Sequence, residues 1–205
     1  MPQITKIKAQ KNKKRVNLYL DNQYAFGLDA DNFLKAGLKV GQKLSQKEVD
    51  ELIFKNQFQK MLDRTLRLIS RRPRSEKEIR DYLKKKKATS KLSQKLIKKL
   101  KKLGQLDDQT FAFWWVEQRT AFRPRGKFGL IMELRQKGID QEMIDKAIEP
   151  INELPLAEKT AKRKAKILKN LPKEKVYQKL SAFLARRGFS WETIKKVVAK
   201  ELSKC

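Results

Sequence analysis

An internal repeat of about fifty residues constrains the fold of this chain more than any other feature of its sequence. Pro73 and Pro124 each lie between two arginines and are 51 positions apart, and Gly138 and Gly188 are 50 positions apart. Apolar residues keep a similar spacing, at Leu83, Leu134 and Leu184. Repeats of this length are typical of stacked helical arrays, so the sequence predicts three consecutive units.

Each unit is predicted to contain three helices. Ser75 and Glu78 have the spacing of a capping box at a helix start, and Gly104 suits the left-handed position that ends a helix. Asp107 and Asp108 precede the next helix, as N-capping residues do. A three-helix unit buries little apolar surface alone, so we expect neighbours to pack against one another in an elongated, curved array.

The N-terminal segment has a different pattern. Apolar residues alternate on both sides of Asp21-Asn22, which predicts a β-hairpin, and residues 3–9 are expected to add a third strand. The basic loop at residues 11–15 is expected to add a contact with the partner, and the alternative is that the N-terminal segment only packs against the first repeat. Ser45 and Glu48 have capping-box spacing, and from there the pattern is helical. We therefore predict a mainly α fold, with a small N-terminal hairpin or three-stranded segment at residues 1–56 and three-helix repeats at 57–106, 107–152 and 153–205.

The charge of the chain indicates a polyanionic partner. Its 205 residues include 51 Lys and Arg against 23 Asp and Glu, a formal net charge of +28. Such a charge causes self-repulsion in a compact fold, and the expected partner inside a cell is nucleic acid, bare or coated with protein. An acidic membrane surface ranks second, because the sequence lacks a helix that combines a strongly basic face with a wide aromatic one.

Residue types exclude several other classes. The chain has no histidine and one cysteine, Cys205, so thiolate–imidazole zinc sites and histidine-dependent catalytic triads are excluded. An alternative is a metal site made of Asp107, Asp108 and Glu117. Helix capping explains the two aspartates better, because they directly precede a predicted helix. We expect no enzyme activity and no cofactor. The longest apolar run, residues 111–116, is far shorter than the ~20 residues that span a bilayer, and the N-terminus does not resemble a leader, so we expect a cytoplasmic protein.

Two groups of cations are candidate binding residues because they occupy equivalent places at the proline-marked turns of the repeat, and a pair of arginines later in the chain is a weaker third candidate. Arginine suits bidentate contact with phosphate or carboxylate, and the alternative is solvated turn residues. The groups are Arg71, Arg72 and Arg74; Arg123, Arg125 and Lys127; and, more weakly, Arg186 and Arg187. The lysine runs at residues 84–87 and 95–102 are interpreted as generic charge.

An aromatic group lies just before the second cation group. Phe111, Trp115 and Phe122 fall near one helical stripe, which predicts core positions for Phe111 and Trp115. Trp114 points about 100° away from that stripe and is the candidate aromatic contact, since exposed rings stack on single-stranded bases.

Several of these motifs together resemble the RecX family of bacterial regulators of the RecA recombinase. They are the run from Arg71 to Ile79, the Gly104–Asp108 joint, Phe111-Ala112, and Arg125-Gly126 leading to Leu134 and Gly138. Tyr24–Gly27 resembles the strand-rich extension of Gram-positive-type members. The last unit departs from the pattern, with Leu171-Pro172-Lys173 in place of Arg-Pro-Arg.

The resemblance implies a non-enzymatic modulator in DNA repair, recombination and the SOS response. Family members lie in the groove of the RecA–single-stranded DNA filament, limit its growth and depress its ATPase and strand exchange. The three cation groups are then expected to face the filament, with direct nucleic-acid contact as an addition and the protein as a monomer. Alternatives are a general DNA- or RNA-binding protein acting without RecA and a scaffold without nucleic acid. Capping of filament ends, groove occupation and faster disassembly all remain open as routes to inhibition.

Overall fold

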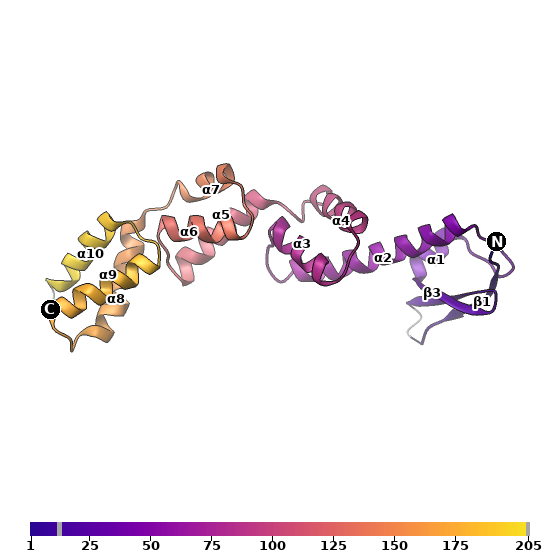
Figure 1. Cartoon of the computed structure of the whole chain (residues 1–205), viewed down its shortest axis with the longest axis horizontal. Helices are drawn as coiled ribbons and strands as arrows, with labels where there is room; N and C mark the ends of the chain where they lie inside the picture. Colours follow the sequence, from indigo (N-terminus) through magenta and orange to yellow (C-terminus); the bar gives the residue numbers. More distant parts are fainter. Residues whose placement is uncertain (12–13, 204–205) are drawn as a thin grey trace. The chain divides into compact units, whose positions relative to one another are not determined.

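The computed structural model describes residues 1–11 and 14–203 and shows a small antiparallel sheet followed by helices (Figure 1). The strands are β1 (Ile4–Ala9), β2 (Arg15–Leu20) and β3 (Gln23–Asp29). The helices are α1 (Ala30–Ala36), α2 (Gln46–Ile69), α3 (Glu76–Lys85), α4 (Ser90–Lys102), α5 (Asp108–Phe122), α6 (Lys127–Gln136), α7 (Gln141–Ile148), α8 (Glu153–Leu168), α9 (Lys173–Arg186) and α10 (Trp191–Leu202). The chain forms two compact units: residues 1–72 with 84–100, and residues 73–83 with the described residues from 101 onward.

In the first unit, the predicted hairpin is confirmed. Asp21 and Asn22 have φ of +46° and +66°, the left-handed values of the turn that matches strand twist, and Leu20 pairs with Gln23. β1 pairs with β2 as the predicted third strand, giving the order β1-β2-β3. The sheet and the start of α2 share one core. The strands contribute Ile4, Leu18 and Leu28, and α2 contributes Val49 and Leu52. Of the predicted basic loop, residues 12 and 13 lie outside the described residues.

The predicted capping box at the start of α2 is also confirmed. The backbone N–H of Glu48 donates to the Ser45 hydroxyl, and the Glu48 carboxylate accepts from the backbone N–H of Ser45 at 2.7 Å. From this cap α2 runs for 24 residues to Ile69. It crosses the expected boundary at residue 56 without a break, because the sequence between Ser45 and Ser70 contains neither glycine nor proline.

In the second unit, two three-helix groups each enclose their own core: α5, α6 and α7 around Phe111 and Leu134, and α8, α9 and α10 around Leu180 and Leu184 (Figure 1). Equivalent repeat positions are fully buried, at Ile79, Leu83, Leu130, Leu134, Leu180 and Leu184. Gly138 and Gly188 end α6 and α9 with φ of +78° and +77°. The apolar spacing and the two glycines therefore mark the same points of successive repeats, as the sequence predicts.

Candidate partner-binding surface

The Arg-Pro-Arg turn before α3 forms a joint with the repeat that follows. The Ser75 hydroxyl donates to the backbone carbonyl of Lys137 at 2.8 Å and accepts from the backbone N–H of Glu78 at 3.2 Å. The backbone N–H of Glu76 donates to the Asp108 carboxylate at 2.7 Å. Asp108, the first residue of α5, thus satisfies an amide that would otherwise be unpaired at the start of α3, while the Ser75 hydroxyl pairs with a carbonyl at the end of α6.

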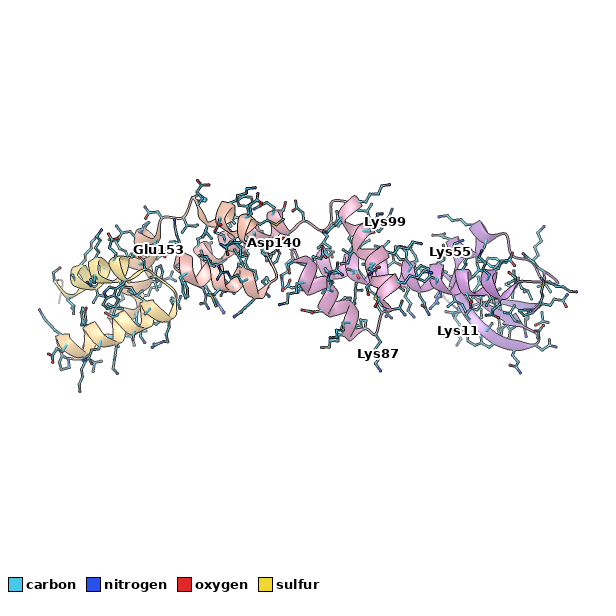
Figure 2. All side chains as sticks on the ribbon, turned by 45° about the horizontal axis from the view of Figure 1, so that its top comes forward. Lys11, Lys55, Lys87, Lys99, Asp140 and Glu153 are labelled. Atoms are coloured by element: carbon cyan, nitrogen blue, oxygen red, sulfur yellow. The ribbon has the colours of Figure 1, made fainter. Side chains whose placement is uncertain are left out.

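The Arg-Pro-Arg turn before α6 forms a second joint at the equivalent place. The backbone N–H of Gly126 donates to the backbone carbonyl of Arg187 at 3.1 Å. Glu153, labelled in Figure 2, is the first residue of α8. Its carboxylate accepts from the backbone N–H of Lys127 at 2.5 Å. The same carboxylate accepts from the backbone N–H of Ser190 at 3.2 Å. An acidic residue at the next repeat's first helix therefore caps the second helix at both joints.

The two joints differ where Ser75 and Gly126 occupy equivalent positions. At Gly126 a Cβ would overlap the carbonyl oxygen of Gly188 and the backbone of Phe189. At the second joint the backbones of the two repeats are therefore in direct contact, whereas the first joint has room for the side chain of Ser75. Sequence reasoning identified these turns but missed that they join repeats, although the recurrence of an acidic residue at a helix start was a signal.

The first predicted cation group directly precedes Ser75 of the first joint in the sequence. Arg71 is exposed, while Arg72 and Arg74 are half-buried. Arg74 forms a long ion pair with Glu78, at 3.9 Å between Nη1 and Oε2, and Glu78 also pairs with Lys137 at 2.6 Å. Arg74 is thus part of the joint, and Arg71 is the most accessible member of this group.

The second and third predicted groups come together at the second joint. The Arg187 guanidinium donates to the backbone carbonyl of Pro124 at 3.1 Å and lies 4.7 Å above the Phe183 ring. Burial lowers the pKa of Arg187, and the nearby positive charges of Arg125 and Arg123 lower it further. Three guanidiniums that the sequence assigned to two clusters therefore share one location. The other two candidates, Lys127 and Arg186, are half-buried and exposed, respectively.

Glu133 on α6 is the carboxylate that partly balances this positive charge. It accepts from Arg119 Nε at 2.7 Å, from Arg125 Nε at 2.7 Å and from the indole N–H of Trp115 at 2.8 Å. The Arg119 guanidinium also stacks 4.5 Å from the Trp115 ring. Sequence reasoning missed Glu133; its signal was a lone acidic residue within the otherwise apolar stretch of α6.

The aromatic group differs in part from the prediction. Phe111 is buried as expected, but Trp114 and Trp115 are both half-buried, and Trp114 packs 5.8 Å from Phe111 between ring centroids. Trp114 is therefore not the most exposed ring of this group; Phe113 is 47% exposed. Phe122 is 72% exposed because it is the last residue of α5, beyond which the chain turns away.

Of the two aspartates expected to cap α5, Asp107 does so, whereas Asp108 is already the first residue of α5 and its carboxylate caps α3 through the Glu76 N–H. Asp107 accepts from the backbone N–H groups of Gln109 and Thr110, which confirms the capping interpretation, and its bond from the Thr110 hydroxyl lowers its pKa. Among the described residues, no three His, Cys, Asp or Glu side chains come together as metal ligands would. Within the same part of the chain, each helix is too short or too polar to span a bilayer.

Comparison with known proteins matches the chain along most of its length. Family models described as the RecX N-terminal domain and the first, second and third RecX three-helix domains match residues 2–45, 62–100, 107–148 and 152–198. Regulatory protein RecX of Bacillus subtilis (strain 168) is 35% identical over 198 residues, covering 95% of this chain and 75% of that protein. The counterpart from Clostridium tetani is 34% identical, covering 97% and 94%.

Solved structures agree with these matches. A crystal structure of regulatory protein RecX superposes with a TM-score of 0.73 at 29% identity, covering 96% of this chain and 98% of that one. RecX from Lactobacillus salivarius gives a TM-score of 0.61 at 21% identity, covering 72% and 97%, which supports the fold.

Proposed function

Because the chain belongs to the RecX family of regulatory proteins, we propose that it regulates homologous recombination and DNA repair by binding the RecA–single-stranded DNA filament. Binding limits growth of the filament and lowers its ATPase and strand-exchange activities. The protein acts as a monomer in the cytoplasm, without a cofactor and without catalysing a reaction.

Charge is divided unequally among the three three-helix domains, and this observation favours a nucleoprotein filament as the partner. Residues 62–100 contain 15 Lys and Arg against 4 Asp and Glu, and residues 152–198 contain 13 against 4. Residues 107–148 between them contain 7 of each and are formally neutral. Phosphates of a nucleic acid would attract the two outer domains but not the middle one.

The middle domain, although formally neutral, also exposes large apolar side chains that lie close together in the sequence. Phe122 and Phe128 are 72% and 64% exposed, and Met132, one turn beyond Phe128 on α6, is 40% exposed. Aromatic residues, methionine and arginine are enriched in the centres of protein–protein interfaces. The exposed phenylalanines of residues 107–148 therefore favour contact with protein.

Arginines adjoin these phenylalanines. Arg123 follows Phe122 directly in the sequence and contributes, with Arg125 and Arg187, to the guanidinium group at the second joint. One carboxylate, Glu133, pairs with Arg125 there. Guanidinium forks suit bidentate contact with a carboxylate or phosphate of the partner, which would relieve their mutual repulsion.

A filament coated with RecA offers protein surface and phosphate together. Separate domains that engage neighbouring parts of one filament gain avidity from individually modest contacts. A general nucleic-acid-binding protein, the alternative, would explain the two basic domains but not the exposed apolar side chains of the neutral one.

The test is the DNA-dependent ATPase of RecA measured against increasing amounts of this protein. We expect inhibition at protein concentrations well below that of RecA, with single-stranded DNA in excess. Inhibition that begins only when the protein is abundant enough to coat the DNA would mean competition for DNA and would contradict the proposal.

A further inference from the structure

Two phenylalanines on α2 and lysines on α4 form a mixed aromatic and basic surface in the first unit. The Lys95 ammonium lies 5.1 Å from the centre of the Phe54 ring and 5.7 Å from that of Phe58. The Lys91 ammonium lies 5.6 Å from the Phe54 ring. Both rings are half-buried and both lysines are exposed. We call this surface, together with the exposed Lys98, the lysine–phenylalanine face.

The three lysines share one side of α4. Their spacing of four and three residues places them one above the other along the helix. α4 contains no Asp or Glu, and among the described residues none of these three lysines forms an ion pair with a carboxylate. Lys101 on the same helix differs, because its hydrogen bond and charge pairing with Glu76 raise its pKa. Positive charge on the lysine–phenylalanine face is therefore not neutralised internally.

The aromatic rings position these ammonium groups but do not neutralise their positive charge. A cation over an aromatic face is attracted by the quadrupole of the ring, but no opposite charge is supplied. Lys95 is held between two rings one helical turn apart, which restricts the ammonium to a small region. The lysine side chains are therefore partly ordered before binding. An anion that binds them costs less side-chain entropy than one that binds freely moving lysines.

We propose that the lysine–phenylalanine face binds the backbone of single-stranded DNA directly, without RecA. Proteins that bind single strands follow the phosphate backbone with basic side chains, and here the half-buried rings position those cations. Lysine is depleted in protein–protein interfaces, which favours DNA over an acidic protein surface. The proposal rests on the proposed function in that it assigns the DNA of the filament to this face.

The experiment measures binding of the 205-residue chain to a fluorescent oligothymidylate, without RecA, by anisotropy over a range of salt concentrations. The test variant is K91A/K95A/K98A. The matched control is K35A/K47A/K60A, which removes three exposed lysines of α1 and α2 that lie outside both basic domains, and so lowers the net charge equally. All six positions are exposed in helices, where alanine is well tolerated.

We expect the test variant to bind at least about tenfold more weakly at low salt, with the slope of log K against log salt smaller in magnitude by about 2, or ~0.7 for each lost phosphate contact. The control is expected to lose less than about threefold, as a nonspecific change of charge would. The variant K91R/K95R/K98R should retain binding. The variant F54L/F58L should bind more weakly than wild type, because the ammonium groups lose the rings that position them.

Equal losses in the test and control variants, or wild-type affinity in the test variant, would overturn the proposal. A test variant that binds oligothymidylate normally but no longer inhibits the RecA ATPase would show that the face contacts protein, which also overturns it. The filament proposal is judged separately by wild-type inhibition of RecA. Failure there, with DNA binding lost only in the test variant, would reject the filament role and leave this site standing.

Discussion

The backbone N–H of Gly126 hydrogen-bonds to the backbone carbonyl of Arg187, which draws the start of α6 against the end of α9. At the equivalent joint between the first and second repeats, the Ser75 side chain makes the matching contact to the Lys137 carbonyl. The joints between repeats are therefore built from the same turns that carry the arginines, so a substitution there is expected to affect both stability and the proposed partner contact.

Substitution of Gly126 by alanine should destabilise the second joint. The added Cβ would overlap the Gly188 carbonyl oxygen and the Phe189 backbone, neither of which can move as a flexible side chain would. We expect a loss of about 2–3 kcal/mol in the free energy of unfolding, measured by urea denaturation. S75G at the equivalent position should cost about 1 kcal/mol, because it removes hydrogen bonds without creating overlap. A G126A protein as stable as wild type would contradict the backbone-to-backbone closure.

Glu133 should be important for stability because it pairs with Arg119, Arg125 and the Trp115 indole. E133Q leaves two guanidiniums beside a neutral amide, and we expect a loss of about 1–3 kcal/mol in unfolding free energy, followed by tryptophan fluorescence. E142Q is the matched control: Glu142 pairs with Lys146 on an exposed helix face, so no measurable loss is expected. Equal effects of the two substitutions would show that Glu133 is no more than a surface partner.

Asp108 should make the free energy of unfolding depend on pH with a sign opposite to that of an ordinary ion-paired carboxylate. Burial raises the pKa of the Asp108 carboxyl above its ordinary value of 3.8, although the hydrogen bond from the Glu76 N–H opposes this. The folded state therefore keeps the proton longer than the unfolded state, and this contribution to stability is lost as pH rises from 3.8 through the raised pKa.

The D108N variant separates the charge of Asp108 from its hydrogen bond. An asparagine oxygen can still accept from the Glu76 N–H, so the stability of D108N relative to wild type should increase as pH rises through that window. D108A removes the acceptor and should cost about 1 kcal/mol. The measurement is urea denaturation at several pH values, and a D108N protein whose relative stability falls as pH rises would show that the sign is wrong.

Phe128 should contribute to RecA inhibition but not to stability or DNA binding. Its side chain is 64% exposed on the formally neutral middle domain, so truncation removes little packing. If Phe128 lies near the centre of the RecA contact, F128A should need about tenfold more protein for half-inhibition of the ATPase, a value typical of an interface hot spot. I167A is the control, since Ile167 is 75% exposed on α8. Loss of oligothymidylate binding in F128A would place DNA, not protein, at this residue.

Arg123 tests the guanidinium group at the second joint. It is exposed, whereas Arg125 and Arg187 also bond within the protein, so R123A should remove a partner contact with little effect on folding. We expect half-inhibition of the RecA ATPase to require about three- to tenfold more protein. R163A on α8, also exposed, is the charge-matched control. Equal behaviour of the two variants would indicate that only net charge matters.

Much of the local structure could be predicted because each signal lies within a turn or two of the chain. The Asp21-Asn22 turn, the Ser45–Glu48 capping box and the left-handed glycines at 138 and 188 all follow from backbone geometry that few residue types satisfy. The spacing that aligns Leu83, Leu134 and Leu184 likewise reports which positions are buried in each repeat.

What the sequence by itself determined is therefore the helical content, the N-terminal hairpin and the register of the repeats. Only the tertiary structure decided that Arg187 joins Arg123 and Arg125, that Glu133 balances them and that Phe122 is exposed at the end of its apolar stripe. The physical reason is range: capping and periodicity depend on neighbours along the chain, whereas these contacts depend on how one repeat packs against the next, which no spacing within a single helix records.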